Sequence, residues 1–363
     1  MTEPLAPFLV SRPEGLHAPA LDAWIDPAAA CPRAILTHAH ADHAAAGHGE
    51  VWATAETIGL YRRRNPDWSG AARTLAYGEP VSAGGMELTL FPAGHVLGSA
   101  QVRLESAAAG SLLYTGDFKL RASRTAGAAS APPSDLLVTE TTFGLPVFRF
   151  PGREELESRL VEACHETLAA GETPVVLAWA LGKAQEAIAV LTEARLPTVV
   201  HGAAWKLLPE FEAAGLAFPM SRPYESGPPR EGEVLIAPPS CSRTEMVRRI
   251  KRRRVVYLSG WALREASRPE RDADVLIPWS DHADFDDLLR HVDAIAPRRV
   301  FTLHGFASDF AAIVESRGIP AEPLAGFEER APEGGDEEGA PEGRDDKPAP
   351  RDPDESRGPA GDA

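Results

Sequence analysis

Short apolar segments that end in polar residues recur along the first part of the chain. Five segments have the apolar runs or the apolar–polar alternation that predict β-strands: residues 21–26, 32–38, 86–95, 111–117 and 135–144. Residues 101–106 precede the turn at Gly110 and predict a hairpin with residues 111–117. Several of these strands end in residues that can bind a metal or transfer a proton: His38, His95, Asp117 and Glu140. Because strand ends converge on one rim in α/β and sandwich folds, we expect the functional site there.

The middle of the chain has another periodicity. Residues 153–171 have helical spacing and stop at a glycine, and residues 173–180 form an apolar run typical of a buried strand. The next helix is predicted over residues 181–194 and the next strand over residues 196–202. Two more predicted strands, 233–240 and 254–262, extend the series. This β-α-β alternation predicts a parallel sheet covered by helices.

The earlier pattern returns near the end, where residues 274–295 and 299–305 again contain apolar strands that lead to His282 and His304. We therefore predict an α/β protein in which a first domain, residues 1–147 and 273–327, is interrupted by a second α/β domain, residues 148–272. The length of 363 residues suits two domains.

Composition and charge bear on the disorder of the C-terminal residues and on the expected location of the protein. Residues 328–363 hold 13 acidic and 5 basic side chains, so they carry −8 of the net charge of −16. They are rich in Pro and Gly and are predicted to be disordered. No run of 18 apolar residues predicts a membrane span, and no secretory signal is apparent. The three cysteines are far apart and fit neither a metal knuckle nor a disulfide framework, so a cytoplasmic location is expected.

The densest chemistry lies in THAHADH, residues 37–43. His38 and His40 are two residues apart at a strand end, so both rings can point the same way. Asp42 and His43 follow and can face a second position nearby. Imidazole nitrogen and carboxylate oxygen both suit zinc, so the segment predicts part of a site for two adjacent metals. The missing ligands would come from His95, Asp117 and His304.

The alternative is an accidental polar loop, since an isolated His-x-His is often a surface feature. Joined to Gly-His, Thr-Gly-Asp and a late His-Gly, the run is too specific for that interpretation. The remaining histidines are interpreted as structural or incidental: His17, His48, His165, His201 and His291.

The segments THAHADH, AGHVLGS and YTGDFK resemble successive motifs of the metallo-β-lactamase fold, an αββα sandwich with its metals at one edge. Asp26 in WIDP fits the earlier aspartate of that fold, which supports the site from behind its ligands. The resemblance implies that His38, His40 and His95 bind one zinc ion. Asp42, His43 and His304 would bind the other, and Asp117 would bridge the two.

Further segments resemble the nucleic-acid-processing β-CASP branch: VTETTFG with Glu140, LGKAQEA, WSDHAD with His282, and the late LHG. His304 lies 187 residues after Asp117, which leaves room for an inserted β-CASP domain. The resemblance covers residues from about 20 to 325 and is most similar to bacterial ligase-associated DNA exonucleases, which are encoded beside a DNA ligase and a helicase. DNA-repair members of the branch in eukaryotes commonly lack the last histidine, so His304 keeps an RNA substrate open.

This resemblance implies phosphodiester hydrolysis with two Zn²⁺ ions, with Mn²⁺ as an alternative. Asp42 and Asp117 would act at the metals, His282 would be the general acid, and Glu140 would orient it. Weaker candidates for substrate contact are Lys183 and Gln185 at a helix start, and Arg252 and Arg253 in the basic run 247–254, which alternatively is a solvated helix face. Three rival functions are an RNA nuclease, a small-molecule hydrolase and a non-catalytic binding module.

Overall fold

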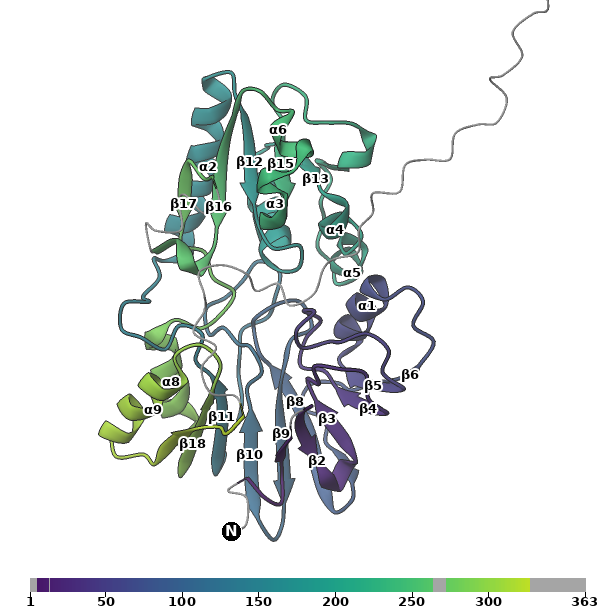
Figure 1. Cartoon of the computed structure of the whole chain (residues 1–363), viewed down its shortest axis with the longest axis vertical. Helices are drawn as coiled ribbons and strands as arrows, with labels where there is room; N and C mark the ends of the chain where they lie inside the picture. Colours follow the sequence, from purple (N-terminus) through teal and green to yellow (C-terminus); the bar gives the residue numbers. More distant parts are fainter. Residues whose placement is uncertain (1–4, 13, 264–271, 327–363) are drawn as a thin grey trace, which may run out of the picture.

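The computed structural model describes residues 5–12, 14–263 and 272–326, whose strands form three sheets. Sheets A and B lie together in the lower lobe of Figure 1, and sheet C lies in the upper lobe. The described helices include none that is both long enough and apolar enough to cross a membrane. The predicted disordered tail, residues 328–363, lies outside the described residues.

Sheet A has six strands in the order of the chain: β1 (Val10–Arg12), β2 (Gly15–Ala18), β3 (Ala23–Ile25), β4 (Arg33–Ile35), β5 (Glu50–Ala53) and β6 (Ala71–Thr74). Helix α1 (Ala55–Arg64) covers one face, and Thr54 caps its N-terminus because the Thr54 hydroxyl accepts a hydrogen bond from the Thr57 amide. Successive side chains of β4 point to opposite faces of the sheet. Ala34 therefore packs with Tyr61 of α1, whereas Ile35 faces sheet B.

Sheet B has seven strands in the order β19-β18-β11-β10-β9-β8-β7. Their bounds are β7 (Val81–Ala83), β8 (Met86–Pro92), β9 (Ala100–Ser106), β10 (Gly110–Tyr114), β11 (Leu136–Glu140), β18 (Arg299–Leu303) and β19 (Ala321–Pro323). The predicted hairpin is the antiparallel pair β9 and β10. On β10, Leu112 and Tyr114 face sheet A, while Leu113 packs with α8 (Phe285–Ile295) and α9 (Ala307–Ser316). The layers are therefore α1, sheet A, sheet B and α8 with α9, the expected αββα order (Figure 1).

Sheet C has the order β14-β13-β15-β12-β16-β17, and all its strand pairs are parallel, as the β-α-β alternation predicts. Its strands are β12 (Thr173–Leu177), β13 (Thr198–Val200), β14 (Ser221–Pro223), β15 (Val234–Ala237), β16 (Arg253–Leu258) and β17 (Val275–Ile277). Helices α2 (Arg153–Ala169) and α3 (Lys183–Glu193) pack on one face. The other described elements of this lobe are α4 (Gly202–Trp205), α5 (Leu208–Ala213) and α6 (Glu245–Arg248), with the 3-10 turns Tyr224–Ser226, Pro239–Arg243 and Gly260–Leu263.

The strands of sheet C all lie between β11 and β18 of sheet B in the sequence. Strand β17 follows the predicted boundary at residue 272 but pairs with β16, so sheet C continues to Ile277. Parallel strands place their carboxyl ends at the same edge. In Figure 1 that edge of sheet C points down toward the lower lobe, where the carboxyl ends of β10, β11 and β18 point up.

Candidate metal centre and its surroundings

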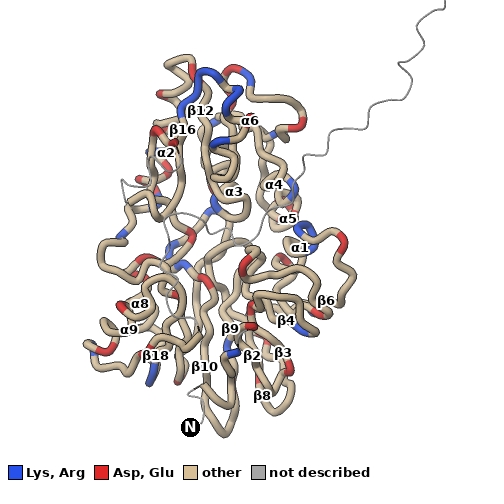
Figure 2. The backbone as a smooth tube through the Cα atoms, in the orientation of Figure 1, with Lys and Arg blue, Asp and Glu red and all other residues tan. Residues whose placement is uncertain are grey.

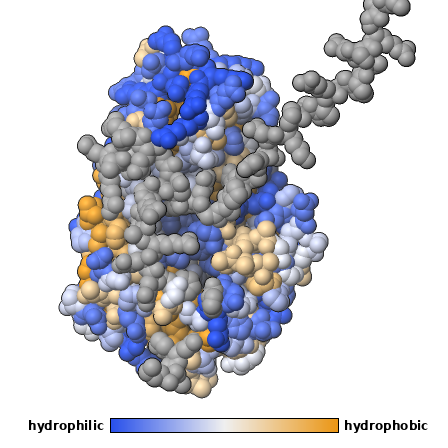
Figure 3. Space-filling view, viewed as in Figure 1, coloured by the Kyte–Doolittle hydropathy of each residue, from blue (hydrophilic) through white to orange (hydrophobic). Residues whose placement is uncertain are grey.

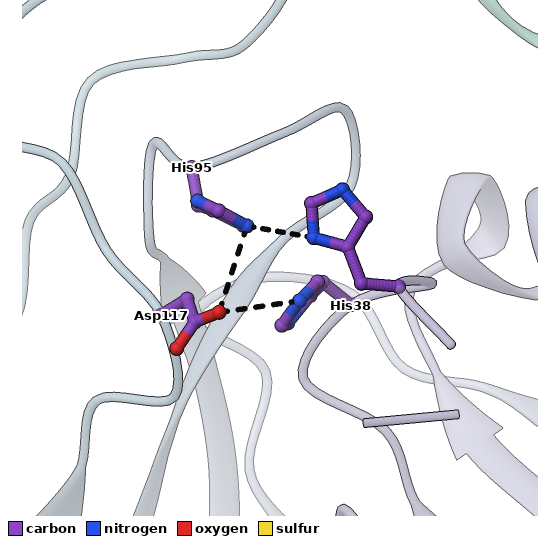
Figure 4. Close-up of side chains that lie close together, drawn as sticks. His38, His95 and Asp117 are labelled. Carbon is purple, nitrogen blue, oxygen red and sulfur yellow. Dashed lines mark hydrogen bonds and ion pairs between the residues drawn. The ribbon is translucent and has the colours of Figure 1, made fainter. Parts of the chain in front are cut away.

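The predicted ligands come together at the edge where strands of sheets A and B end. His38 follows β4, His95 follows β8, Asp117 follows β10 and His304 follows β18. Strands β10, β11 and β18 are parallel to one another, so their carboxyl ends share this edge. In Figure 4 the side chains of His38, His95 and Asp117 point toward one another.

One ligand atom from each of His38, His40, His95 and Asp117 lies within 4.8 Å of the others. Asp117 Oδ2 is 3.6 Å from His38 Nε2 and 3.7 Å from His95 Nε2, and His95 Nε2 is 3.0 Å from His40 Nδ1. Among the described residues, the buried His38 Nε2 has no hydrogen-bond partner. A buried nitrogen aimed at two further imidazoles and a carboxylate fits a divalent metal ion of the zinc type.

The second nitrogen of each of these histidines is held from outside the cluster. His38 Nδ1 is 3.0 Å from Thr37 Oγ1, His40 Nε2 is 3.2 Å from the Leu181 carbonyl, and His95 Nδ1 is 2.9 Å from the Asp281 carbonyl. Such contacts fix the orientation and tautomer of a metal-binding histidine. They turn the inward nitrogens of the three rings toward one another and toward Asp117, where they could bind a common ion.

The other predicted set gathers around His43. Its Nε2 lies 3.4 Å from Asp117 Oδ2 and 3.7 Å from Asp42 Oδ2, and its ring centre is 6.0 Å from that of His304. The Asp42 side chain is 51% exposed. This set is thus adjacent to the first and shares Asp117 with it, but it is more open, and the second metal position stays a prediction.

Asp26 lies behind His43, as the sequence predicts for a supporting carboxylate. Its Oδ2 accepts hydrogen bonds from His43 Nδ1 at 3.0 Å, Thr37 Oγ1 at 2.6 Å and Tyr114 OH at 3.2 Å. Its Oδ1 accepts from the Thr37 amide at 2.7 Å. Sequence reasoning missed the roles of Thr37 and Tyr114, although each is the first residue of a quoted motif, THAHADH and YTGDFK. Asp26 therefore fixes the ring of His43 and the backbone next to His38 together.

Burial and charge set the protonation of the cluster. Burial lowers the pKa of His38 and His95 well below the usual imidazole range, and lowers that of His304 to about 4. Burial also acts to lower the pKa of His43, but Asp117, Asp42 and Asp26 outweigh it and raise the pKa. Burial raises the pKa of Asp117 to about 7 against the opposing effect of His43. Neutral imidazoles are the form that binds metal.

His282 and Glu140 form a second group beside the first. His282 Nδ1 donates to Glu140, with distances of 3.0 Å to Oε2 and 3.2 Å to Oε1, and lies 4.0 Å from Asp117 Oδ2. Glu140 also accepts from the Phe118 amide and from Thr142 Oγ1. Burial raises the pKa of Glu140, but the charge and the hydrogen bond of His282 outweigh burial and lower it. The pairing predicted between Glu140 and His282 is thus present.

A small depression that is partly open to solvent lies against His282. Its walls carry the cationic side chains of Lys119, Arg121 and Arg153, and the acidic side chains of Glu186 and Asp287. Lys119 Nζ is 3.7 Å from Glu186 Oε2, and Arg121 pairs with Asp287 at 3.4 Å. A sequence signal for these two residues exists, since Lys119 and Arg121 stand two and four residues after Asp117.

Two predicted substrate contacts have other roles. Lys183 is 3% exposed, and its Nζ lies 3.1 Å from Asp281 Oδ2. Gln185 is fully buried, and its side chain bonds to the Gly182 amide at 2.8 Å and the Ala180 carbonyl at 2.9 Å. Both side chains are thus taken up by protein groups rather than open to a substrate, which corrects the prediction.

The basic run 247–254 lies at the opposite end of sheet C. Arg253 begins β16, whereas Leu258 ends it near the site, and six strand residues span roughly 20 Å. Figure 2 shows Lys and Arg gathered at the top of the upper lobe, and Figure 3 shows a hydrophilic surface there. Arg252 and Arg253 are therefore not brought to the metal cluster. Arg252 bonds to the Ala170 carbonyl and Arg253 to that of Ile250.

Known proteins resemble between 44% and 87% of this chain, although no family model matches it. A probable DNA ligase of Opitutus terrae is 40% identical over 316 residues, which are 87% of this chain and 31% of the relative. The endoribonuclease YSH1 of Yarrowia lipolytica is 31% identical over 44% of this chain and 23% of the relative. The transcription termination factor FttA of Methanothermobacter thermautotrophicus is 32% identical over 47% of this chain and 33% of the relative.

The chain thus spans only between 23% and 33% of the length of these relatives. Among solved structures, a protein of unknown function from Enterococcus faecalis has a TM-score of 0.57 over 80% of this chain and 79% of that chain. At 14% identity this likeness shows a shared fold and nothing finer.

Proposed function

We propose that this chain, whose relatives confirm its resemblance to the metallo-β-lactamase-fold β-CASP nucleases, hydrolyses phosphodiester bonds of DNA. We further propose that it is an exonuclease with a functional link to a DNA ligase and a helicase. In this proposal the lobe around sheet C is the inserted β-CASP domain.

The observation that carries the proposal is the cluster of His38, His40, His95 and Asp117, with each imidazole anchored on its outer nitrogen. Such pre-oriented nitrogen and oxygen atoms suit metal-assisted hydrolysis. The cluster also lies beside an acid–base pair, His282 with Glu140, which a purely structural metal site does not need.

The first metal position would be held by His38, His40 and His95, and the second by Asp42, His43 and His304, with Asp117 shared. Zinc fits these atoms best, and manganese is the alternative. Divalent ions at this place supply a water of lowered pKa and neutralise the charge of a phosphoryl group.

The residues of the chain supply proton transfer. Glu140 favours the protonated form of His282 because its carboxylate accepts the Nδ1 proton at 3.0 Å. The Nε2 proton is then available for the sugar oxygen that leaves when the phosphodiester bond breaks. Lys119 and Arg121 line the neighbouring depression, and their positive charges suit a phosphate group.

Two observations bear on the choice of nucleic acid. The relative that covers most of this chain is a probable DNA ligase, which favours DNA. The endoribonuclease among the relatives, together with a histidine at position 304, favours the second candidate, an RNA-processing nuclease on the same scaffold. A small-molecule hydrolase is a weaker rival, because the lobe around sheet C contacts His40 and would narrow access to the site.

The test is product analysis on end-labelled single-stranded and double-stranded DNA and on RNA of matched sequence, with Zn²⁺ or Mn²⁺ supplied. We expect short products released from the ends of DNA and no attack on circular single-stranded DNA, which has no end. Asp117→Asn is the inactive control. Robust cleavage of RNA with inert DNA would establish the RNA alternative. Turnover of thioesters or lactones without nuclease activity would overturn the nuclease proposal.

A further inference from the structure

Two of the three histidines in the cluster of His38, His40, His95 and Asp117 are held by segments that follow strands of sheet C. The Leu181 carbonyl, which contacts His40 Nε2 at 3.2 Å, lies between β12 and α3. The Asp281 carbonyl, which contacts His95 Nδ1 at 2.9 Å, follows β17. The orientation of these two rings therefore depends on how the upper lobe sits on the lower one.

A buried ion pair joins these two anchoring segments. Lys183 Nζ lies 3.1 Å from Asp281 Oδ2, and the two side chains are 3% and 2% exposed. Lys183 is two residues after Leu181, and Asp281 carries both the carboxylate of the pair and the carbonyl that faces His95. One contact thus links the backbone behind His40 to the backbone behind His95.

The turn between Leu181 and Lys183 has little freedom. Gly182 has φ 90°, and a Cβ there would meet Val96 Cγ1 at 2.7 Å and Asp281 Oδ2 at 3.0 Å. The side chain of Gln185 binds the amide of Gly182 and the carbonyl of Ala180, which fixes the turn from the helix side. Because this turn has little freedom, the position of the Lys183–Asp281 pair also fixes the positions of the Leu181 and Asp281 carbonyls.

We propose that Lys183, through Asp281, is a positioning residue for the metal centre and couples the seating of the upper lobe to metal affinity. The inference rests on the proposed metal centre but not on the identity of the nucleic acid. It assigns Lys183 a role on the ligands rather than on substrate phosphates. Loss of the pair would leave His40 and His95 in place but less firmly oriented, and outer contacts of this kind change metal affinity about 10- to 100-fold.

The main test is the double variant Lys183→Met with Asp281→Asn, measured for Co²⁺ binding by competition with a chromophoric chelator and by the visible spectrum of the bound ion. Removing both charges avoids a lone buried charge, which would itself destabilise the fold. We expect a folded protein whose dissociation constant for Co²⁺ rises about 10- to 100-fold. The single variants Lys183→Met and Asp281→Asn should each lose at least as much Co²⁺ affinity as the double variant. Lys183→Arg, which keeps the charge, should bind Co²⁺ more tightly than Lys183→Met.

Lys206→Met is the matched control, because Lys206 is an exposed lysine of the same lobe, and it should bind Co²⁺ like the parent protein. Unchanged Co²⁺ affinity and spectrum in the folded double variant would overturn the proposal. A raised KM with unchanged Co²⁺ affinity would overturn it as well and would make Lys183 a substrate contact. If the parent protein itself binds no Co²⁺, the proposed metal centre fails first, and the two failures are thereby distinguished.

Discussion

Replacing Asp26 by Asn tests whether the carboxylate behind His43 supports the metal centre. Asp26 has φ 44°, a left-handed conformation that Asn tolerates and Ala does not, so Asn removes the charge without adding backbone strain. Asp22 is a matched control at the other end of β3, with φ 46° and a side chain that is 92% exposed. Asp22→Asn should change neither stability nor metal binding.

The magnitude follows from the hydrogen bonds that Asp26 accepts. Its two oxygens take donors from Thr37 N, Thr37 Oγ1, His43 Nδ1 and Tyr114 OH, at 2.6 to 3.2 Å. An amide has one oxygen, so its best orientation loses the bond from Thr37 N and weakens the other three. At about 1.5–3 kcal/mol for a bond to a charged group, we expect the free energy of unfolding to fall by about 2–4 kcal/mol. Metal affinity should fall about 10- to 100-fold.

The assays are urea denaturation of the metal-free protein, followed by tryptophan fluorescence, and competitive titration with Zn²⁺. Tyr114→Phe removes only the longest of the four bonds, at 3.2 Å, and should cost about 1 kcal/mol with little change in metal affinity. If Asp26→Asn lowered stability but bound Zn²⁺ like the parent protein, Asp26 would serve only to hold the end of β3 against the loop after β4. No change in either measurement would refute the reasoning.

Three further predictions concern catalysis, metal and pH. His282→Gln and Glu140→Gln should each lower kcat at least about 100-fold while Zn²⁺ affinity stays near that of the parent, and a comparable loss of Zn²⁺ would contradict a proton-transfer role. Chelation should abolish hydrolysis, and Zn²⁺ or Mn²⁺ should restore it in the parent protein but not in Asp117→Asn; recovery in that variant would argue against a shared ligand. Burial lowers the pKa of His291 from 6.5 to about 4, so below pH 6.5 the unfolded state binds more protons and stability falls as the pH falls. At pH 5 the metal-free parent should have lost about 2 kcal/mol, relative to neutral pH, that His291→Leu does not lose, and parallel pH profiles from urea denaturation would contradict this.

The elements that could be predicted are those whose pattern is dictated by burial on one side or both. Residues 153–171 and 173–180 correspond to α2 and β12, because an amphipathic helix and a buried strand each have a clear periodicity. Strand β6 was missed, since all four of its residues are exposed and nothing in their pattern requires pairing. Predicted strands also ran too long: β4 ends at Ile35 and β10 at Tyr114, so His38 and Asp117 lie on loops just beyond them.

The candidate ligands could be predicted because their residue types and spacing recur in a recognisable order. The partner of Lys183 could not, because Asp281 is 98 residues away and only the folded chain brings the two together. For the same reason the sequence could not place the basic run, residues 247–254. Its composition gives its charge, but the parallel pairing of β12 with β16 puts it at the end of sheet C far from the candidate site.

The four residues from Asp281 to Asp284 hold several parts of the candidate site in place. Each of its residues contacts a different part of the molecule. The Asp281 carbonyl faces His95, and the His282 ring donates to Glu140. The Ala283 amide donates to the Phe118 carbonyl, and Asp284 accepts from the Asp287 amide at the start of α8.

These four contacts reach a candidate metal ligand, the proposed acid–base pair, the loop after Asp117 and the cap of a helix. A shift of one residue would break all of them at once, since each requires its own side chain or backbone group at a fixed place. The proposed proton donor, His282, and the carbonyl that supports a candidate metal ligand, that of Asp281, are thus adjacent in sequence because one segment positions both. It follows that the backbone of this segment sets the position of His282 relative to the candidate metal centre. Asp281 also pairs with Lys183 of the upper lobe, so a change in the position of that lobe would move His282 and the support of His95 together.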